Sequence, residues 1–484
     1  MEYASNHGNG IAFRTLTLEQ IQEIHSASCR VLEEVGVVVH HDEAADLLKR
    51  AGAYTDSTGR TYIPSALVKR ALQTAPSRIT LYNRLGEPAL FLEKSNVYFG
   101  AGSDTLIYLD PFTGERRPWQ SSDVAAALRV VDALPNLDFA MSMGLLSDVD
   151  RRMINREQYA LMLKNSIKPQ VVIAEDRETV ADIFEMAAAA AGGEEALKHR
   201  PIFALYCEPT SPLQLPFESV DKLLLAAEKR IPVNFACGAV AGASTPVTVA
   251  GTVVQANAEA LCGLVLHQLK NPGAPFLYGY GDSPLDMRTM VAAYAVPEAL
   301  LLQGCLCDLA RYYFLPSWGY AGCSSSKAFD EQAVVEATMF TLIGALQGCN
   351  LMHDVFYIES GRTGSLELLV LSDEVISRVR HILAGVDTSP EYLAVEAIKR
   401  VGPGGNFLGD MHTAKHFRES WKGELSDFSG YDAWAAAGAK TMGDRIREKL
   451  KKIIENHRPV PLSPEAEREV ERILRRAEER LGSS

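Results

Sequence analysis

The sequence predicts an α/β fold, a TIM-type (β/α)8 barrel with an N-terminal helical cover and a C-terminal helical extension. Eight short apolar runs recur along the chain, and a stretch with helical spacing follows each. The runs are continuously apolar, as are parallel strands buried on both faces. A chain of 484 residues, 47% of them hydrophobic, is long enough for such a barrel with insertions. The runs begin at Val97, Leu137, Pro169, Pro201, Ile231, Ala274, Phe314 and Cys349.

Residues 1–95 do not follow this alternation. Thr17 precedes an amphipathic stretch that ends at Gly36, a pattern typical of a helix with an N-cap and a glycine C-cap. Two further helices are predicted at Glu43–Arg50 and Pro64–Thr74. We expect residues 1–95 to form a helical and short-strand cover over one end of the barrel.

The barrel itself is predicted for residues 96–370. Stretches such as SSDVAAALRVVDAL and ETVADIFEMAAAAAG separate the runs, open at a Ser, Thr or Glu and end near Gly, Pro or Asn. Parallel strands need such crossover helices between them. The regular alternation of run and helix therefore predicts the barrel.

Residues 371–484 form the predicted C-terminal extension, packed on the barrel. Helices are expected at Ser372–Leu383, Pro390–Arg400 and Tyr431–Ile454. The tail SPEAEREVERILRRAEERL is an amphipathic helix rich in charges of both signs. Its apolar stripe packs on its own chain or on a second subunit, while the charged face is solvated.

Composition and charge exclude several classes of protein. No basic start with an apolar h-region and no apolar run of about 18 residues is present, so we expect no membrane association and a cytoplasmic location. The eight cysteines lack disulfide-module spacing, as is typical of reduced intracellular thiols. A net charge of −13 argues against nucleic-acid binding, which needs a basic surface. It is compatible with a cationic substrate.

In a barrel of this class the chemistry lies where the strands end. Aromatic side chains gather there, and aromatic faces hold cations by cation–π contacts. Ordinary core packing is the alternative for any one of them, and since strand side chains alternate, Tyr278 and Tyr280 are expected to share a face. The strand-end aromatics predicted to bind substrate are Phe99, Tyr206, Tyr278, Tyr280 and Phe356, with Phe235, Trp318, Tyr320 and Tyr357 nearby in the sequence.

Fewer polar residues than aromatic residues occur at the predicted strand ends. Asp104 follows the first strand among glycines, Glu208 follows Tyr206, Asn234 lies in the fifth run, and His353 ends the eighth. Each has a structural alternative: Asp104 as a turn cap, Glu208 in a salt bridge, and His353 bonded to the adjacent aspartate or to backbone. Asp104 and His353 are the best candidates for a catalytic role.

Three further features admit two interpretations each. Arg288 could hold a carboxylate or form an ion pair with another side chain. The serines and Lys327 of GYAGCSSSKAFDEQ could bind a carboxylate or cap the helix that begins near Asp330. His412 and His416 have the spacing of a metal pair but lack the glutamate of an HExxH motif, so we expect them to be structural or lid residues and expect no metal.

Several long segments carry a resemblance to a known family. They are YFGAGSDTLIYLDPFTGERRP, VQANAEALCGLVLHQLKNPGAPFLYG, the Asp286-Met287-Arg288 turn, SKAFDEQAVVEATMF and NFLGDMHTAKHFRESW. In these segments the chain resembles the trimethylamine methyltransferase superfamily over nearly its whole length. The resemblance implies a TIM-type barrel and an enzyme that moves a methyl group from a quaternary amine to the Co(I) corrinoid of a separate protein. It also implies a homo-oligomer.

One departure from that family bears on the substrate. Members acting on trimethylamine carry pyrrolysine, and only the standard residues occur in WGYAGCSSSKAFDEQ, where it is expected. The resemblance therefore implies a non-pyrrolysine member acting on a substrate that is already cationic, such as glycine betaine, proline betaine or carnitine, in the methyl metabolism of methanogens or acetogens. In-line attack on such a substrate needs positioning rather than a proton donor or a metal.

The corrinoid, cobalamin, is expected to come from a partner protein, with no cofactor bound tightly by this chain. The DxHxxG motif that such carrier proteins present is absent from the sequence. The loops with Asp286, Ser324 and His412 are candidates for the docking rim. Two other functions stay open: a betaine-binding protein without turnover, and another barrel hydrolase or lyase that uses Asp104 and Glu208.

Overall fold

A curled, seven-stranded parallel sheet lies at the centre of the computed structural model, which describes residues 12–279 and 281–482. Its strand order is β6-β18-β17-β14-β12-β10-β9. The strands are β6 (Tyr98–Phe99), β9 (Gln170–Val172), β10 (Phe203–Cys207), β12 (Val233–Phe235), β14 (Phe276–Gly279), β17 (Ser317–Tyr320) and β18 (Leu351–His353). Each comes from one of the predicted runs, which confirms the α/β class and these seven strands.

The remaining run, the second in sequence, starts at Leu137 and lies between the two edges of this sheet. Phe139 makes a parallel bridge to Gly100, next to β6, and Ala140 makes one to Gln170 of β9. A Cβ on Gly100 would lie 2.5 Å from the Phe139 ring, so only glycine allows this approach. The eight runs therefore follow one another around the sheet in the predicted order.

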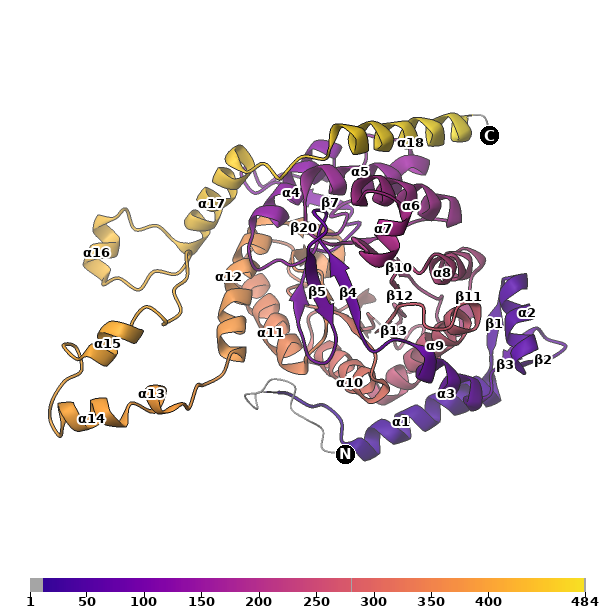
Figure 1. The fold of residues 1–484 in the computed structure, drawn as a ribbon, viewed down its shortest axis with the longest axis horizontal. Coiled ribbons are helices and arrows are strands. Elements are labelled where there is room, and N and C mark those ends of the chain that lie inside the picture. Colours follow the sequence, from indigo (N-terminus) through magenta and orange to yellow (C-terminus); the bar gives the residue numbers. More distant parts are fainter. Residues whose placement is uncertain (1–11, 280, 483–484) are drawn as a thin grey trace.

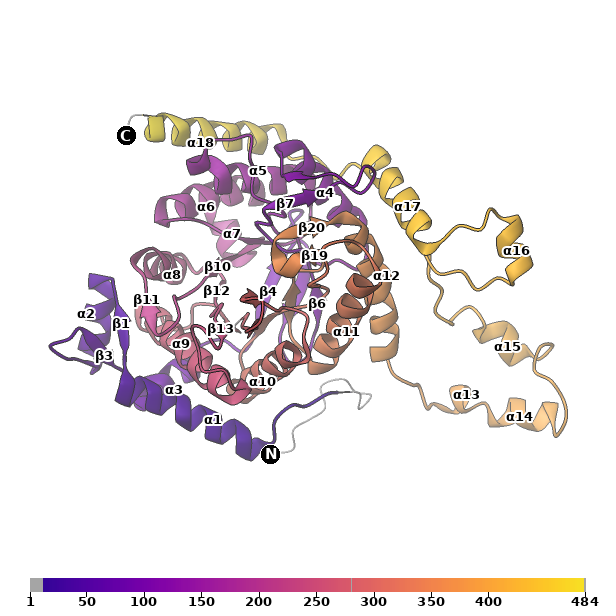
Figure 2. The same ribbon diagram turned by 180° about the vertical axis from the view of Figure 1, so that it is seen from behind.

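Helices surround the sheet, as parallel crossovers require (Figures 1 and 2). They are α4 (Ser121–Ala133), α5 (Ile154–Asn165), α6 (Arg177–Ala191), α8 (Phe217–Lys229), α9 (Val249–Lys270), α10 (Pro297–Tyr313), α11 (Glu331–Gln347) and α12 (Leu366–Leu383). Side-chain caps start several of them, such as Asp176 on α6, Thr248 on α9 and Asp330 on α11. Within the described residues only α9 is long and apolar enough to span a membrane, and it is mostly buried, as a core helix is.

A hairpin of β4 (Ile79–Tyr82) and β5 (Pro88–Leu92) closes the end of the sheet where the strands begin (Figure 1). Its backbone bonds to residues that precede strands, as from Tyr82 to Pro201. Its apolar side chains pack with the inward-facing residues of the strands, which include Phe139, Met141, Val171, Ala204, Ala236, Leu277, Trp318 and Leu351.

The predicted N-terminal helices form as α1 (Leu18–Arg30), α2 (Asp42–Ala51) and α3 (Ser65–Thr74). They lie beside the barrel against α9, together with a small sheet of β1 (Val37–Val39), β2 (Tyr54–Thr55), β3 (Arg60–Tyr62) and β11 (Gln214–Leu215). The predicted cover over a barrel end thus comes from the hairpin alone, and the helices pack sideways. The predicted boundaries at residues 95 and 370 stay predictions.

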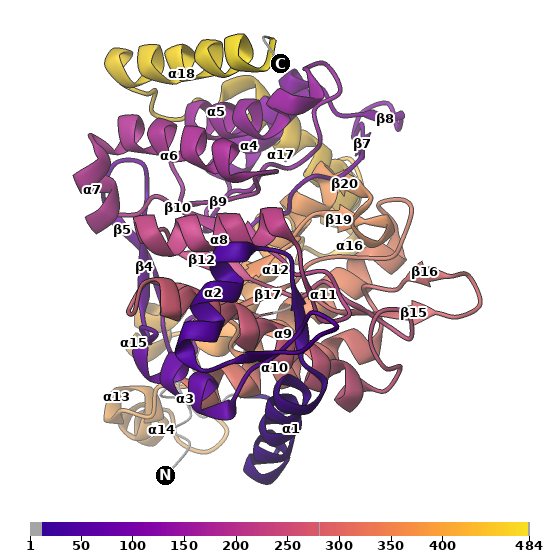
Figure 3. The same ribbon diagram turned by 90° about the vertical axis from the view of Figure 1, so that its right-hand side faces the viewer.

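The loops that follow the strands carry their own short strands. β7 (Ile107–Leu109), β8 (Arg116–Pro118), β19 (Tyr357–Ile358) and β20 (Thr363–Ser365) form one sheet. A second contains β13 (Val240–Ala241), β15 (Ser283–Asp286) and β16 (Val291–Ala292). In the side view the β15–β16 hairpin projects from the side of the molecule opposite to β4 and β5 (Figure 3). These loops therefore build the C-terminal end of the barrel.

The C-terminal helices differ in part from the prediction. The predicted helix Pro390–Arg400 is divided into α13 (Pro390–Leu393) and α14 (Val395–Val401), because Ala394 between them has a φ of 54°. The predicted helix Tyr431–Ile454 is divided into α16 (Tyr431–Ala436) and α17 (Met442–Asn456), with Thr441 capping the second. In sequence, α15 (Met411–His416) lies between α14 and α16. The last helix, α18 (Pro464–Gly482), packs on α6 of the same chain.

Candidate functional site

Five ring side chains from different strands and loops meet where the barrel strands end. The ring of His353 stacks on Trp318 with centroids 4.3 Å apart and an interplanar angle of 20°. Tyr206 lies 5.7 Å from Trp318, and Tyr320 lies 6.4 Å from His353 and 6.1 Å from Tyr294. We call Tyr206, Tyr294, Trp318, Tyr320 and His353 the aromatic cluster.

Strand alternation brings these rings to one face. Trp318 and Tyr320 are two residues apart on β17, and the parallel register pairs Tyr320 with His353 on β18. Trp318 packs with the inward-facing core residues, so the face of β17 that carries Trp318 and Tyr320 is directed into the barrel. On the neighbouring strand a Cβ at Gly279 would lie 2.9 Å from the Trp318 Cβ. Glycine at that position therefore leaves room for the tryptophan.

The carboxylate of Glu208 lies at the edge of the cluster, where the Tyr206 hydroxyl donates a 2.9 Å hydrogen bond to it. Glu208 is exposed to solvent, and yet burial by the surrounding protein raises the pKa of its carboxyl. A group that both reaches solvent and is desolvated lies in a recess of the surface rather than on a convex part. Tyr206 and Tyr294 are half-buried, and burial raises the pKa of both phenols as well.

His353 is oriented by its neighbour in sequence. Its Nδ1 forms a short hydrogen bond with the buried carboxylate of Asp354, and Nε2 has no hydrogen-bond partner among the described residues. A carboxylate partner fixes the proton on Nδ1, so the neutral ring presents the Nε2 lone pair to the cluster. The structural alternative for His353, a bond to Asp354, is what the structure shows, and the other nitrogen stays available.

Asp104 lies in the loop that follows β6 and has a φ of 54°. It accepts hydrogen bonds from the Ser142 hydroxyl at 2.7 Å and from the Gln158 amide at 2.9 Å, while burial raises its pKa. Burial, with the charges of Asp354 and Asp104, raises the pKa of Tyr357, whose hydroxyl accepts a 2.7 Å bond from the Ser103 backbone N–H. Asp104 therefore belongs to a separate network beside the aromatic cluster.

Asn234 faces the inside of the barrel next to Tyr206, with which it is in register on β12. It is buried, and neither its amide oxygen nor its amide nitrogen has a partner among the described residues. Buried amides are nearly always hydrogen-bonded. A bound ligand or water would therefore satisfy this side chain.

Three predicted substrate-binding residues lie away from the cluster. Phe99 is on the outer face under the Arg380 guanidinium, 5.8 Å from its ring centroid. Tyr278 donates a 2.8 Å bond to Asn257 of α9 and packs edge-on against Tyr313 of α10, while Phe356 packs near Trp119. Tyr280 lies outside the described residues. The strands are apolar on both faces, so the alternation of side chains alone could not tell which residues of each strand face into the barrel.

Sequence reasoning did not single out Tyr294, which lies in the segment between β16 and α10 and reaches the cluster from there. Nothing in the local sequence relates this residue to a strand end, and only the tertiary fold brings it to Tyr320. Trp318 and Tyr320 had a usable signal, because two aromatics flank Gly319 and must share one face of the strand.

The side chains of the serine loop before α11 bond to that helix and to the loop itself. Ser324 donates to Glu336 at 2.6 Å, Ser326 donates to Asp330 at 2.8 Å, and Lys327 donates to the Ser325 carbonyl. These are the capping contacts of the structural alternative. Arg288, 91% exposed, pairs with Asp286 at 3.3 Å on the β15–β16 hairpin.

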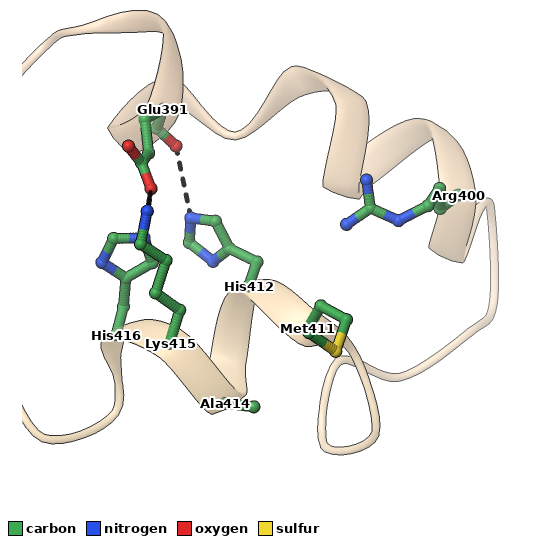
Figure 4. Close-up of a pocket in the computed structure, with 7 residues that line it drawn as sticks. All are labelled: Glu391, Arg400, Met411, His412, Ala414, Lys415 and His416. Atoms are coloured by element: carbon green, nitrogen blue, oxygen red, sulfur yellow. Dashed lines mark hydrogen bonds and ion pairs between the residues drawn. The ribbon is translucent and has the colours of Figure 1, made fainter.

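His412 and His416 lie far from the cluster, on the projecting C-terminal segment. They line a cavity of about 440 Å³ together with Glu391, Arg400, Met411, Ala414 and Lys415 (Figure 4). His412 contacts the Glu391 carbonyl at 3.3 Å, and His416 contacts the Glu419 carboxylate at 2.9 Å. No group of three or more His, Cys, Asp and Glu side chains suited to a metal occurs in the part of the chain that the structure describes.

Comparison with known proteins gives one consistent family. A family model described as trimethylamine methyltransferase (MTTB) matches residues 5–482. Trimethylamine methyltransferase MttB of Desulfitobacterium hafniense is 33% identical over 465 residues, which cover 96% of this chain and 94% of the relative. The glycine betaine methyltransferase of D. hafniense strain Y51 is 30% identical over 475 residues, covering 97% and 98%.

A solved structure shares the fold. The monomethylamine methyltransferase of Methanosarcina barkeri superposes with a TM-score of 0.52 at 11% identity, over 98% of this chain and 90% of that protein. At this identity the similarity concerns the architecture alone.

Proposed function

The chain belongs to the trimethylamine methyltransferase (MTTB) family, and from this premise we propose that it moves a methyl group from a quaternary amine to the Co(I) corrinoid of a separate protein. The aromatic cluster with Glu208 is the observation that carries the proposal. Relatives in the family are named for trimethylamine and for glycine betaine. Both names are consistent with a methylammonium group at the site.

The cluster has the composition that a quaternary ammonium requires. Such a cation has no N–H to donate, so aromatic faces and a nearby carboxylate bind it in place of hydrogen-bond acceptors. Four aromatic rings and His353 supply the faces, and Glu208 supplies the charge. Cation–π contacts are worth about 2 kcal/mol or more at desolvated sites.

The proposed reaction is an in-line displacement at the methyl carbon. The electron pair of Co(I) forms the new Co–C bond, and the pair of the broken C–N bond stays on nitrogen. A neutral tertiary amine leaves, so no proton moves. The role of this chain is to hold the N–CH3 axis toward the open end of the barrel and to exclude water from the reacting centre.

The inner core supports that orientation. Leu277 and Leu351 fill the barrel below Trp318, and the β4–β5 hairpin closes the far end. Access to the cluster is therefore from the C-terminal side, where the loops with Asp286 and Ser324 lie. We propose these loops as part of the corrinoid docking rim. His412 lies far from the cluster on the projecting C-terminal segment, so we do not include it in the docking rim.

We further propose a betaine as the substrate, with the amide of Asn234 and the imidazole of His353 near its carboxylate. The Asn234 amide N–H has no partner among the described residues and can donate a hydrogen bond to that carboxylate.

The two other functions left open by the sequence, a hydrolase or lyase and a betaine-binding protein, receive less support. A hydrolase or lyase that uses Asp104 with Glu208 requires the two carboxylates to act on one substrate. In the described residues Asp104 bonds to Ser142 and Gln158, and Glu208 bonds to Tyr206, with no contact between the two groups. A betaine-binding protein without turnover differs from the proposal only in activity.

The test is an assay with purified protein, a cognate corrinoid protein, a reductant and a panel of glycine betaine, carnitine, choline and trimethylamine. The absorbance of methyl-Co(III) should appear with a quaternary amine and only when every component is present. Binding of an amine without any methyl-Co(III) would favour the binding protein. Demethylation at full rate without the corrinoid protein would reject the mechanism.

A further inference from the structure

Two polar side chains inside the barrel have buried atoms without a hydrogen-bond partner among the described residues. They are Trp318, whose indole nitrogen Nε1 is unpartnered, and Asn234, whose amide oxygen and amide nitrogen both are. Each residue is only 1% exposed. A buried N–H without an acceptor costs free energy, so folded proteins rarely contain one. The two N–H groups therefore indicate a polar group of a ligand, or an ordered water, beside them.

Both side chains adjoin the ring of Tyr206. Asn234 pairs with Tyr206 in the parallel register of β12 and β10, so the two side chains point to the same inner face. The Trp318 ring lies 5.7 Å from the Tyr206 ring. We call Trp318 and Asn234 the donor pair. Their unpartnered N–H groups therefore belong to the region of the aromatic cluster and not to a separate part of the barrel.

The charges around the donor pair favour a zwitterion. Neither member of the pair carries a charge, whereas the carboxylate of Glu208 lies on the other side of Tyr206, whose hydroxyl bonds to it at 2.9 Å. A carboxylate buried without a counter-charge is costly, even where N–H groups bond to it. A betaine brings its own counter-charge, because its ammonium offsets both its own carboxylate and that of Glu208.

We propose that the indole N–H of Trp318 and the amide N–H of Asn234 together bind the carboxylate of a betaine and so fix the orientation of the substrate. The inference rests on the proposed function, since it assumes a quaternary ammonium among the rings of the aromatic cluster. The donor pair is buried, whereas Glu208 reaches solvent. A betaine that extends from the pair to Glu208 therefore directs its methyl groups to the open end of the barrel, where Co(I) must approach.

The donor pair then determines specificity. A simple cation such as tetramethylammonium leaves both N–H groups without a partner, and a site built to hydrogen-bond its substrate discriminates strongly against an analogue that lacks the bonding group. A simple carboxylate such as acetate lacks the counter-charge and is repelled by Glu208. Glycine betaine should therefore bind at least about ten times more tightly than tetramethylammonium, and acetate should displace neither ligand.

Calorimetric titration of the full chain with glycine betaine and with tetramethylammonium tests the proposal. The measured quantity is the ratio of the two affinities, because a merely structural change weakens both ligands alike and leaves the ratio unaltered. N234D keeps the size of the side chain but replaces the donor by an acceptor, and W318F keeps an aromatic face without the N–H. Each should lower the ratio by about tenfold or more. N456D, at an exposed position at the end of α17, is the matched control and should keep the ratio of the wild type.

Ordered water is the other possible partner of the donor pair. If N234D and W318F both keep the ratio of the wild type, the two groups bind water only and the proposal is overturned, while binding of tetramethylammonium still supports the proposed function. A ratio that falls in N234D alone removes Trp318 from the carboxylate site and also overturns the proposal. A wild type that binds neither ligand overturns the proposed function together with this inference. Should N234D not fold, as judged by circular dichroism, the ratio in W318F decides.

Discussion

At the scale of single residues, Glu208 and the aromatic rings attract a cation in two ways. Glu208 attracts it by a full negative charge, and the rings attract it by the negative potential of their faces. The rings hold the methyl groups of any quaternary ammonium. Glu208 adds a full charge whose interaction is strengthened by the desolvation that raises the pKa of its carboxyl. The same desolvation makes an empty site costly, because the carboxylate is then without a cation.

Replacing Glu208 by Gln should therefore weaken binding of tetramethylammonium by about ten- to a hundredfold, or about 1.4–2.8 kcal/mol. The amide keeps the size and the bond from Tyr206 but removes the charge. Calorimetric titration at constant ionic strength measures the loss. E218Q, an exposed position in the first turn of α8, is the matched control and should bind as the wild type does.

The pH dependence of the same titration has a defined sign. Cation binding needs the ionised carboxylate, and the pKa of Glu208 is raised by burial. Binding should therefore fall as the pH is lowered, beginning at a higher pH than for an ordinary glutamate, and the Gln variant should lack this component. Equal affinities of wild type and E208Q at every pH would show that Glu208 does not face the cation.

The residues of the site were predictable only in part from the sequence. Position at a strand end singled out Tyr206, Glu208, Asn234 and His353. It could not separate Tyr278, which points at α9, from Trp318, which points inward, because both faces of a parallel strand are apolar. The environment of His353 required the conformation of Asp354, whose φ of 74° no sequence pattern specifies.

At the scale of elements, most residues of α9 are buried, and this helix contains a histidine in an apolar setting. His267 is 0% exposed, packs 5.4 Å from the Phe276 ring, and has its Nε2 unpaired among the described residues. Burial lowers its pKa from 6.5 to about 3. The folded chain therefore keeps this imidazole neutral at pH values where the unfolded chain protonates it.

The free energy of unfolding should consequently decrease as the pH falls below about 6.5, by about 2 kcal/mol at pH 5. A histidine whose folded pKa is depressed stabilises nothing at low pH and opposes folding there. Urea denaturation of wild type and H267Q between pH 7 and pH 5 measures the difference, which should shrink in the variant. H381Q, an exposed histidine on α12, should retain the slope of the wild type. Identical slopes for wild type and H267Q would contradict the assignment.

Element identity was more predictable than element continuity. The eight strand-like runs and the capped helices α1 to α3 follow from apolar runs and cap residues, which are local signals. The division of the helix at Ala394 follows from a left-handed backbone at a residue that favours helices, so the local sequence predicts the opposite. The side on which α1 to α3 pack depends on α9, which is far away in sequence.

At the scale of the whole molecule, the C-terminal tail is tied to the barrel through one buried carboxylate. Asp182 on α6 accepts bonds from Arg156 at 2.6 Å and, from the tail helix α18, from Arg480 at 2.6 Å and Arg476 at 3.2 Å. Burial acts to raise the pKa of Asp182, and the bonds from Arg156 and Arg480 outweigh it, so the pKa is lowered. The stabilising contribution is therefore present above pH 3.8 and lost as the pH falls through the folded pKa.

Replacing Asp182 by Asn should leave three guanidinium groups around a neutral amide, with the Arg156 side chain only 4% exposed. Removing one member of a buried charge network costs about 3–5 kcal/mol. We expect the urea midpoint to fall and α18 to detach first, because two of the three arginines belong to it. Limited proteolysis should then cut the variant near residue 463 while the barrel stays intact. E185Q removes the exposed partner of Arg476 and should change the midpoint by less than about 1 kcal/mol. A D182N protein with the midpoint and protease resistance of the wild type would mean that the apolar face of α18, rather than this carboxylate, holds the tail in place.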